Sequence, residues 1–172
     1  MSEFVAGNQI KLLRDGAEYF PALEAAIEAA EFEIYLQTYI FEADETGLRI
    51  GNALKRAALR GVYVYMLLDG FGSKDLPKTF IIDLENSGIE VLIFRPKISP
   101  WTLQRSRLRR MHRKMTVVDG QIGFVGGINI IEDYNTRSLL TPRNEKAVQI
   151  EGPILQSMHA TMELIWRKLC RV

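Results

Sequence analysis

Residues 112–129, HRKMTVVDGQIGFVGGIN, decide the fold and the candidate site of this chain. The valines near the centre of this stretch predict a strand over residues 111–118, because β-branched side chains favour extended backbone. The Asp119-Gly120 pair that follows is a favoured two-residue hairpin turn. We therefore expect residues 121–125 to return as an antiparallel strand.

Residues two apart on a strand point to the same face of its sheet. His112 and Lys114 are therefore expected to share one face, where an imidazole and an ammonium can meet one phosphate group. Gly126 and Gly127 allow the backbone to bend closely around a ligand, so that the carboxamide of Asn129 can approach the same point. The alternative is a surface hairpin that carries a histidine and a lysine by chance.

These side chains suit the cleavage of a phosphodiester, which requires a nucleophile, charge stabilisation and an acid for the leaving alkoxide. The neutral imidazole of His112 can attack phosphorus and form a phosphohistidine, while Lys114 and Asn129 bind the non-bridging oxygens. No cluster of His, Asp and Glu has metal-ligand spacing, so we expect neither a metal nor another cofactor. Asp119, in the turn, is expected to fix the hairpin through hydrogen bonds to the backbone.

Length and composition indicate one ordinary globular domain over residues 1–172, with 47% hydrophobic and 25% charged residues. The single cysteine, Cys170, excludes an internal disulfide. No apolar run approaches the roughly 20 residues that span a bilayer. The first residues also lack the basic start and apolar core of a signal peptide. Any membrane contact is therefore expected to be peripheral.

Strands and helices alternate along the chain. Asp44 is expected to cap the second helix, and Pro21 to lie in the first turn of the first. The alternation predicts an α/β fold with one mixed β-sheet flanked by helices on both faces. Besides the hairpin, strands are predicted over residues 9–14, 32–41, 62–68, 90–94 and 146–151, and helices over residues 18–30, 46–59, 76–87 and 153–169.

Basic charge is concentrated just before the hairpin. Residues 91–118 contain eight basic residues and no acidic one, although the net charge of the whole chain is only +1. Interleaved with aromatic and aliphatic side chains, this stretch suits an anionic membrane surface or a nucleic-acid backbone. The alternative is a solvated loop. The side chains expected to bind a membrane or another anion are Trp101, Arg105, Arg107, Arg109, Arg110 and Arg113.

The spacing of His112, Lys114 and Asp119, followed by the Gly-Gly-x-Asn segment, resembles the signature of the phospholipase D superfamily. The resemblance extends over residues 7–168. This resemblance implies that the chain has the α-β-α sandwich fold of that superfamily. Flanking segments resemble the first catalytic half of bacterial cardiolipin synthases, namely residues 7–13, 19–21, 68–73 and 151–153.

The resemblance also implies a role for Glu145, which falls where family members carry the acidic residue that orients the attacking imidazole. The alternative is a solvated residue at the start of a strand. Gly127 stands where nuclease-type members often have serine, and this favours the lipid branch.

By resemblance, the chain is expected to transfer a phosphatidyl group between phospholipids through a phosphohistidine. Its substrate would be an anionic phospholipid, phosphatidylglycerol, and its location the cytoplasmic side of the bacterial cell membrane, as a peripheral protein. One alternative is a phospholipase D-like phosphodiesterase or homodimeric endonuclease that acts on nucleic acid. The other is an inactive fragment that binds anionic membranes.

The family mechanism requires a second His-x-Lys motif, whose histidine protonates the leaving group. The only other histidine, His159, is expected to be a surface or packing residue. The second motif would come from a C-terminal continuation of the chain or from a second copy in a homodimer. We expect the reading frame to continue, so that residues 1–172 form one half of a two-motif catalytic unit.

Overall fold

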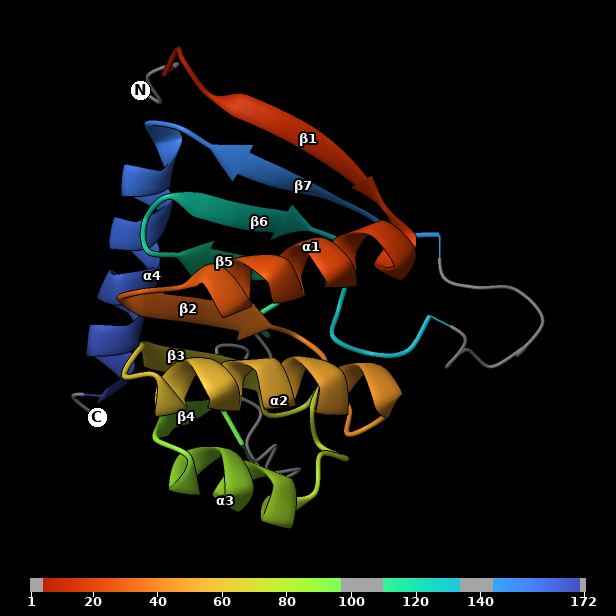
Figure 1. The fold of residues 1–172 in the computed structure, drawn as a ribbon. Helices are drawn as coiled ribbons and strands as arrows, with labels where there is room; N and C mark the ends of the chain where they lie inside the picture. The colour runs from red at the N-terminus through yellow and green to blue at the C-terminus, as the bar shows by residue number, and fades with distance from the viewer. Residues whose placement is uncertain (1–4, 97–109, 134–143, 171–172) are drawn as a thin grey trace, which may run out of the picture.

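The computed structural model describes residues 5–96, 110–133 and 144–170 (Figure 1). Within these residues, seven strands form one sheet in the order β1-β7-β6-β5-β2-β3-β4. The elements in chain order are β1 (Gln9–Arg14), α1 (Asp15–Ala29), β2 (Glu33–Thr38), α2 (Glu45–Leu59), β3 (Tyr63–Asp69), α3 (Lys78–Asn86), β4 (Ile89–Phe94), β5 (Met115–Val118), β6 (Ile122–Gly126), β7 (Lys146–Glu151) and α4 (Ile154–Cys170).

The sheet is mixed, as the sequence predicts. Strands β2, β3 and β4 are parallel to one another. The pairs β2/β5, β5/β6, β6/β7 and β7/β1 are antiparallel. Helices α1, α2 and α3 lie on one face of the sheet and α4 lies on the other (Figure 1). The predicted α/β fold with helices on both faces is therefore confirmed.

Alternation along the strands supplies both faces of the sheet with apolar side chains. In β2, Ile34 and Leu36 belong to the core beneath α1 and α2, whereas Tyr35 belongs to a second cluster with Met162 and Trp166 of α4. All five are buried. Burying an apolar side chain of this size stabilises the fold by about 1.5–3 kcal/mol. The two clusters therefore hold the sheet from both sides.

Helix α1 begins earlier than predicted, at Asp15, so the prediction that Pro21 lies in its first turn is wrong. In the first turn of the helix as observed, the backbone N–H of Gly16 donates to Asp133 Oδ2 at 2.9 Å, and this acceptor is distant in the sequence. Such a distant acceptor leaves no local signal in the sequence. The predicted cap of α2 is confirmed, since Asp44 accepts from Gly47 N–H.

The predicted hairpin between β5 and β6 is present, but its loop has three residues rather than two, because Val118 pairs with Ile122, the first residue of β6. Asp119 and Gly120 have φ angles of 52° and 63°. Two consecutive left-handed residues make a type I′ turn, whose twist matches that of the flanking strands. Asp-Gly is suited to it because both residues tolerate positive φ.

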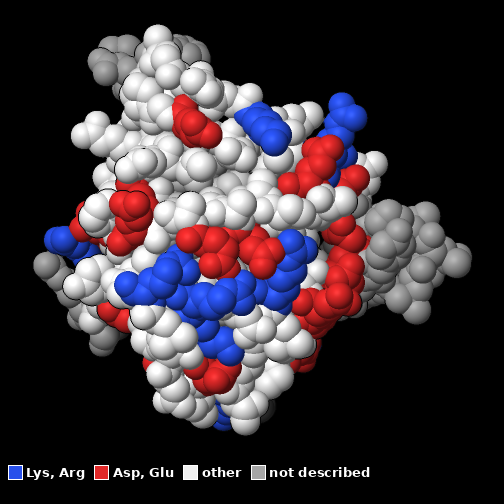
Figure 2. Space-filling view, viewed as in Figure 1, with Lys and Arg blue, Asp and Glu red and all other residues white. Residues whose placement is uncertain are grey.

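A band of basic side chains lies over α2 and meets acidic side chains of α1 (Figure 2). Arg49 pairs with Glu24 at 2.5 Å, and Arg56 and Arg60 pair with Glu28 at 2.6 and 3.2 Å. Arg60 also donates to the carbonyl of Glu28, near the end of α1. The band therefore holds α2 against α1.

In the part of the chain that the structure describes, none of the helices combines the length and the apolar character that a membrane span requires.

Candidate functional site

The ends of four strands meet at one edge of the sheet, on the right in Figure 1. Strands β2 and β6 end at this edge, whereas β5 and β7 begin there. This follows from the pairing, because β5 is antiparallel to both β2 and β6, and β7 is antiparallel to β6. The side chains gathered there come from segments that flank these ends: Tyr39 after β2, His112 and Lys114 before β5, Asn129 after β6 and Glu145 before β7.

The imidazole of His112 stacks on the phenol ring of Tyr39. The ring centroids are 4.1 Å apart and the ring planes meet at 20°. His112 lies before β5 rather than on it, so the prediction of a strand from residue 111 is wrong in its first four residues. The N–H of Met111 donates instead to Asp69 Oδ2 at 2.9 Å. The position of the ring against Tyr39 therefore does not follow from the alternation of a strand.

Lys114 is half-buried beside this stack. Its Nζ donates to the carbonyl of His112 at 3.3 Å and lies 5.3 Å from the centroid of the Tyr39 ring. Burial lowers the pKa of Lys114, and the negative charge of Glu145 acts in the opposite direction. The structure thus brings Lys114 and Glu145 within electrostatic reach of each other. An ammonium has three N–H groups, so Lys114 retains donors for an anion.

Asn129 is buried, and its Oδ1 accepts from Ile40 N–H at 3.1 Å. The same two segments are joined by Ile130 N–H, which donates to the carbonyl of Ile40 at 3.1 Å. With its oxygen engaged by backbone, the group that Asn129 can offer to a phosphate is its amide NH₂. The loop after β2 therefore positions both Tyr39 and Asn129.

The two glycines at the end of β6 have different tasks. A Cβ on Gly126 would collide with the backbone of Lys146 and Ala147 in β7. At Gly127 the nearest atom to such a Cβ is the carbonyl oxygen of Lys146, at 3.6 Å. The expectation that both glycines serve a ligand is therefore revised for Gly126, whose missing side chain is required by the neighbouring strand.

Asp119 lies at the other end of β5 from His112. Its carboxylate accepts three backbone N–H groups, from Glu31 and Phe32 at 2.9 Å each and from Glu33 at 2.8 Å. These bonds tie the hairpin to the start of β2. The structural task predicted for this motif residue is observed, and its carboxylate is not among the groups around His112.

The described part of the predicted anion-binding stretch divides into two. The guanidinium of Arg110 is only 9% exposed, lies 3.8 Å from the carboxylate of Asp69 and donates to the carbonyl of Arg95. It therefore serves the interior of the fold and is not presented to a surface, contrary to expectation. Arg113 is exposed. The other expected members, Trp101, Arg105, Arg107 and Arg109, lie outside the described residues.

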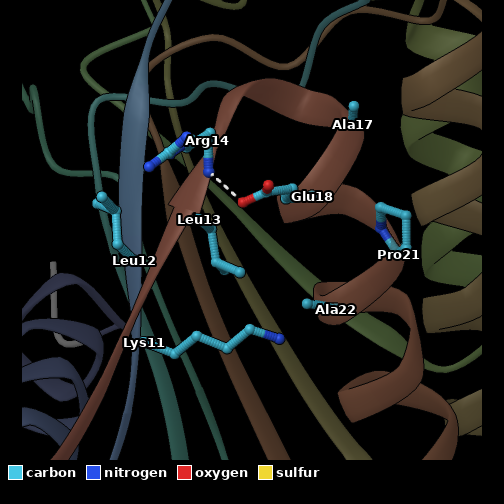
Figure 3. A pocket seen from close by; sticks show the side chains of 8 residues that line it. All are labelled: Lys11, Leu12, Leu13, Arg14, Ala17, Glu18, Pro21 and Ala22. Atoms are coloured by element: carbon cyan, nitrogen blue, oxygen red, sulfur yellow. Dashed lines mark hydrogen bonds between the residues drawn. The ribbon is translucent and has the colours of Figure 1, made fainter.

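An open pocket of about 650 Å³ lies between β1 and α1 (Figure 3). The ammonium of Lys11 extends into it, whereas the guanidinium of Arg14 turns away, and Arg14 N–H donates to Glu18 Oε2 at 2.8 Å. None of the residues that line this pocket belongs to the group around His112. It is therefore separate from the candidate site.

Tyr39 and Asp69 were not predicted from the sequence as site residues. Each stands at or just after the end of a buried strand, β2 or β3. The sequence did contain a signal for such residues: a polar or aromatic residue that directly follows a buried apolar run, at the edge where the other candidates converge.

Among the residues that the structure describes, no group of three or more His, Cys, Asp or Glu side chains could hold a metal ion.

The arrangement of strands and helices is shared with a solved structure of a phospholipase D family member, Nuc from Salmonella typhimurium. The two superpose with a TM-score of 0.66 at 22% sequence identity, over 94% of this chain and 95% of that one. This likeness establishes the fold.

Sequence comparisons extend the likeness. The family model described as "Cardiolipin synthase, PLD-like domain" matches residues 23–166. Cardiolipin synthase B of Salmonella typhimurium is 40% identical over 149 residues, which are 87% of this chain and 36% of that protein. Cardiolipin synthase 1 of Bacillus cereus is 38% identical over 157 residues, or 91% of this chain and 31% of that protein. The chain thus spans about a third of the length of these relatives. It belongs to the family of cardiolipin synthase phospholipase D-like domains.

Proposed function

We propose that this chain is one catalytic half of a phosphatidyltransferase of the cardiolipin synthase type. The observation that carries the proposal is the gathering of an imidazole, an ammonium and a carboxamide at one sheet edge, from segments far apart in the sequence. Lys114 Nζ donates to the backbone carbonyl of His112 there, and Asn129 accepts from the N–H of Ile40, the residue after Tyr39, whose ring stacks on His112. Two relatives named cardiolipin synthase support the assignment of the substrate class.

In the first step, a ring nitrogen of His112 attacks the phosphorus of phosphatidylglycerol. A P–N bond forms while the P–O bond to glycerol breaks, and glycerol leaves with a proton from an acid. Lys114 and Asn129 donate hydrogen bonds to the non-bridging oxygens, where negative charge develops. Glu145 holds the other ring nitrogen of His112 and so fixes its tautomer.

In the second step, the hydroxyl group of another phosphatidylglycerol attacks the phosphohistidine. Its proton passes to the base that acted as the acid before, the P–N bond breaks, and cardiolipin leaves. The acid of the first step must be a second group, because the imidazole of His112 is then bonded to phosphorus. We assign it to the histidine of a second His-x-Lys motif, in a longer chain or in a second copy of this one.

The domain would work as a peripheral protein on the cytoplasmic side of the bacterial membrane, with exposed Arg113 next to the nucleophile facing anionic headgroups. Residues 1–172 would form a single domain of the two-motif unit. Asp119 holds the fold in this mechanism and exchanges no proton.

The test uses vesicles of phosphatidylglycerol labelled with ³²P. As a monomer the chain should form an acid-labile, alkali-stable phosphohistidine only slowly, because the acid is missing, and joining it with a second motif should give labelled cardiolipin and free glycerol. Lys114→Met should lower labelling about 100-fold, as loss of a donor to transition-state charge does. The matched variant Lys11→Met, on β1 and away from His112, should behave as the wild type.

Other products would replace the proposal. Phosphatidic acid without cardiolipin would make the protein a lipase. Nicking of DNA that resists EDTA and falls steeply with salt, without lipid products, would favour the nuclease alternative. Vesicle binding that survives His112→Ala, with no labelling and no turnover, would identify a domain that only binds membranes.

A further inference from the structure

We propose that Asp69 is a positioning residue of the transfer reaction. Together with Ser73, it would clamp the two backbone segments that carry the stacked rings of His112 and Tyr39. The proposal rests on the proposed function, because positioning of His112 affects a rate only if His112 is the nucleophile. Asp69 itself touches neither ring, and it acts through the backbone that precedes the histidine.

The carboxylate of Asp69 is fully buried at the end of β3, with 0% exposure. Its Oδ1 accepts from Phe71 N–H at 2.9 Å and from Gly72 N–H at 3.1 Å. Its Oδ2 accepts from Met111 N–H at 2.9 Å, and the guanidinium of Arg110 lies 3.8 Å from Oδ1. A buried carboxylate is costly unless it is paired and hydrogen-bonded, so its retention here requires all of these partners together.

These bonds join two segments that are 42 positions apart in the chain. One oxygen holds the turn that follows β3, and the other holds the residue immediately before His112. Because Met111 and His112 share a peptide bond, a fixed Met111 N–H restricts where the imidazole can branch from the backbone. The carboxylate therefore sets the approach of the histidine to the sheet edge.

Ser73, at the far end of the same turn, holds the other ring of the stack. Its Oγ donates to the carbonyl of Tyr39 at 3.2 Å and accepts from Phe41 N–H at 3.0 Å. A Cβ on Gly72 would collide with the carbonyl oxygen of Tyr39, so the turn is also pressed against this segment. One five-residue turn thus contacts the backbone on both sides of the His112–Tyr39 stack.

Such a clamp matters for catalysis because a reacting group must be held to within about 0.5 Å of its productive place. A displacement of about 1 Å can cost about 100-fold in rate. Loss of the clamp should therefore appear in the turnover number, whereas the binding of lipid, which Asp69 does not touch, should change little.

The first test reads the imidazole directly, by nuclear magnetic resonance. The chain has only two histidines, and His159 contacts Glu33 at the start of β2, so its signals serve as an internal reference. In Asp69→Asn, whichever way the amide turns, its NH₂ end cannot accept a bond, so one of the two segments loses its acceptor. The His112 ring signals should shift and broaden and lose the ring-current effect of Tyr39. Those of His159 should stay in place.

The second test is kinetic. In the chain joined with a second motif and supplied with phosphatidylglycerol vesicles, Asp69→Asn should lower kcat by about 10- to 100-fold with less than about threefold change in KM. Ser73→Ala should act in the same direction and keeps the proposal testable if Asp69→Asn does not fold. The matched controls are Asp83→Asn and Ser87→Ala on the α3 side, where Asp83 pairs with Lys55 and Ser87 donates to the carbonyl of Asp83.

The proposal is overturned if folded Asp69→Asn and Ser73→Ala keep the His112 signals and kcat of the wild type. It is also overturned if both variants lose stability while the His112 signals of the folded fraction do not move, because Asp69 would then be only structural. A wild-type protein that transfers no lipid even when joined with a second motif would contradict the proposed function instead. The resonance experiment would still decide whether the clamp exists.

Discussion

His159 Nε2 lies 2.5 Å from Glu33 Oε1, at the opposite end of β2 from the ring stacked on Tyr39. Glu33 and Tyr39 are six positions apart along this segment, and at about 3.3 Å per residue their Cα atoms are about 20 Å apart. A proton donor must lie within hydrogen-bond reach of the leaving oxygen, or one water away. His159 therefore cannot protonate a group that leaves from His112 of the same chain.

Replacing His159 by Gln should accordingly leave phosphatidyl transfer within about twofold of the wild type, because the side chain is remote from the phosphate. The lost contact with Glu33 is partly exposed and should cost at most about 1 kcal/mol of the free energy of unfolding. His112→Gln is the matched variant and should abolish labelling. Loss of transfer in a folded His159→Gln variant would contradict the assignment.

Tyr39 should orient the imidazole of His112 through its ring rather than through its hydroxyl. Tyr39→Phe keeps the stack and should retain most of the activity, whereas Tyr39→Leu removes it and should lower kcat about fivefold, since an aromatic contact of this kind contributes about 1 kcal/mol. Steady-state transfer with vesicles gives the comparison. Equal rates for the Phe and Leu variants would show that the stack has no part in catalysis.

Asp119 should contribute to the stability of the fold and not to the transfer reaction. Asp119→Ala leaves three backbone N–H groups of the segment before β2 without their acceptor and should lower the free energy of unfolding by about 2 kcal/mol. Urea denaturation measures this loss, and the exposed Asp75→Ala provides the control. Under conditions where Asp119→Ala is folded, labelling of His112 should persist; a specific loss of labelling would assign Asp119 to the chemistry.

Gly126, the last residue of β6, and Gly127, which follows it, should respond in different ways. Gly126→Ala forces a Cβ into the backbone of β7 and should cost about 2 kcal/mol or more. Gly127→Ala meets only an ordinary contact at 3.6 Å and should unfold like the wild type. Thermal unfolding of the two variants tests this difference. Equal melting temperatures would contradict the close approach of β6 and β7.

Stability should fall at alkaline pH because of Tyr19. This tyrosine is buried and its pKa is raised well above its ordinary range, chiefly by burial, while a hydrogen bond with Thr116 acts in the opposite direction. Above the unfolded pKa of about 10, the unfolded chain binds fewer protons than the folded one, so the free energy of unfolding decreases as pH rises. Below that pH the contribution of Tyr19 is constant.

Tyr19→Phe should therefore flatten the pH dependence of urea unfolding between about pH 10 and 12. The exposed Tyr63→Phe variant is the matched control and should leave that dependence as it is. Parallel curves for wild type and Tyr19→Phe would mean that Tyr19 does not titrate with unfolding.

The local rules of the sequence predicted the elements that depend on a few neighbouring residues. The Asp119-Gly120 turn, the cap of α2 by Asp44 and the mixed sheet with helices on both faces follow from turn chemistry, capping and alternation. The motif and the resemblance also led us to expect His112, Lys114, Asn129 and Glu145 in one site; the structure places them in segments that flank the ends of β5, β6 and β7, and their joint action on a phosphate stays a prediction. These features require only that strands β5, β6 and β7 pair as their apolar patterns direct.

The tertiary structure decided what depends on partners far along the chain. The start of β5 moved to Met115 because the buried carboxylate of Asp69 takes the N–H of Met111. Arg110 is buried beside the same carboxylate instead of lying on the expected basic surface. Tyr39 became the neighbour of His112 only when β2 and β5 paired. Sequence alone determined which groups could perform the chemistry, whereas the packing of distant segments decided their orientation, because a buried charge binds the donors that the fold brings to it.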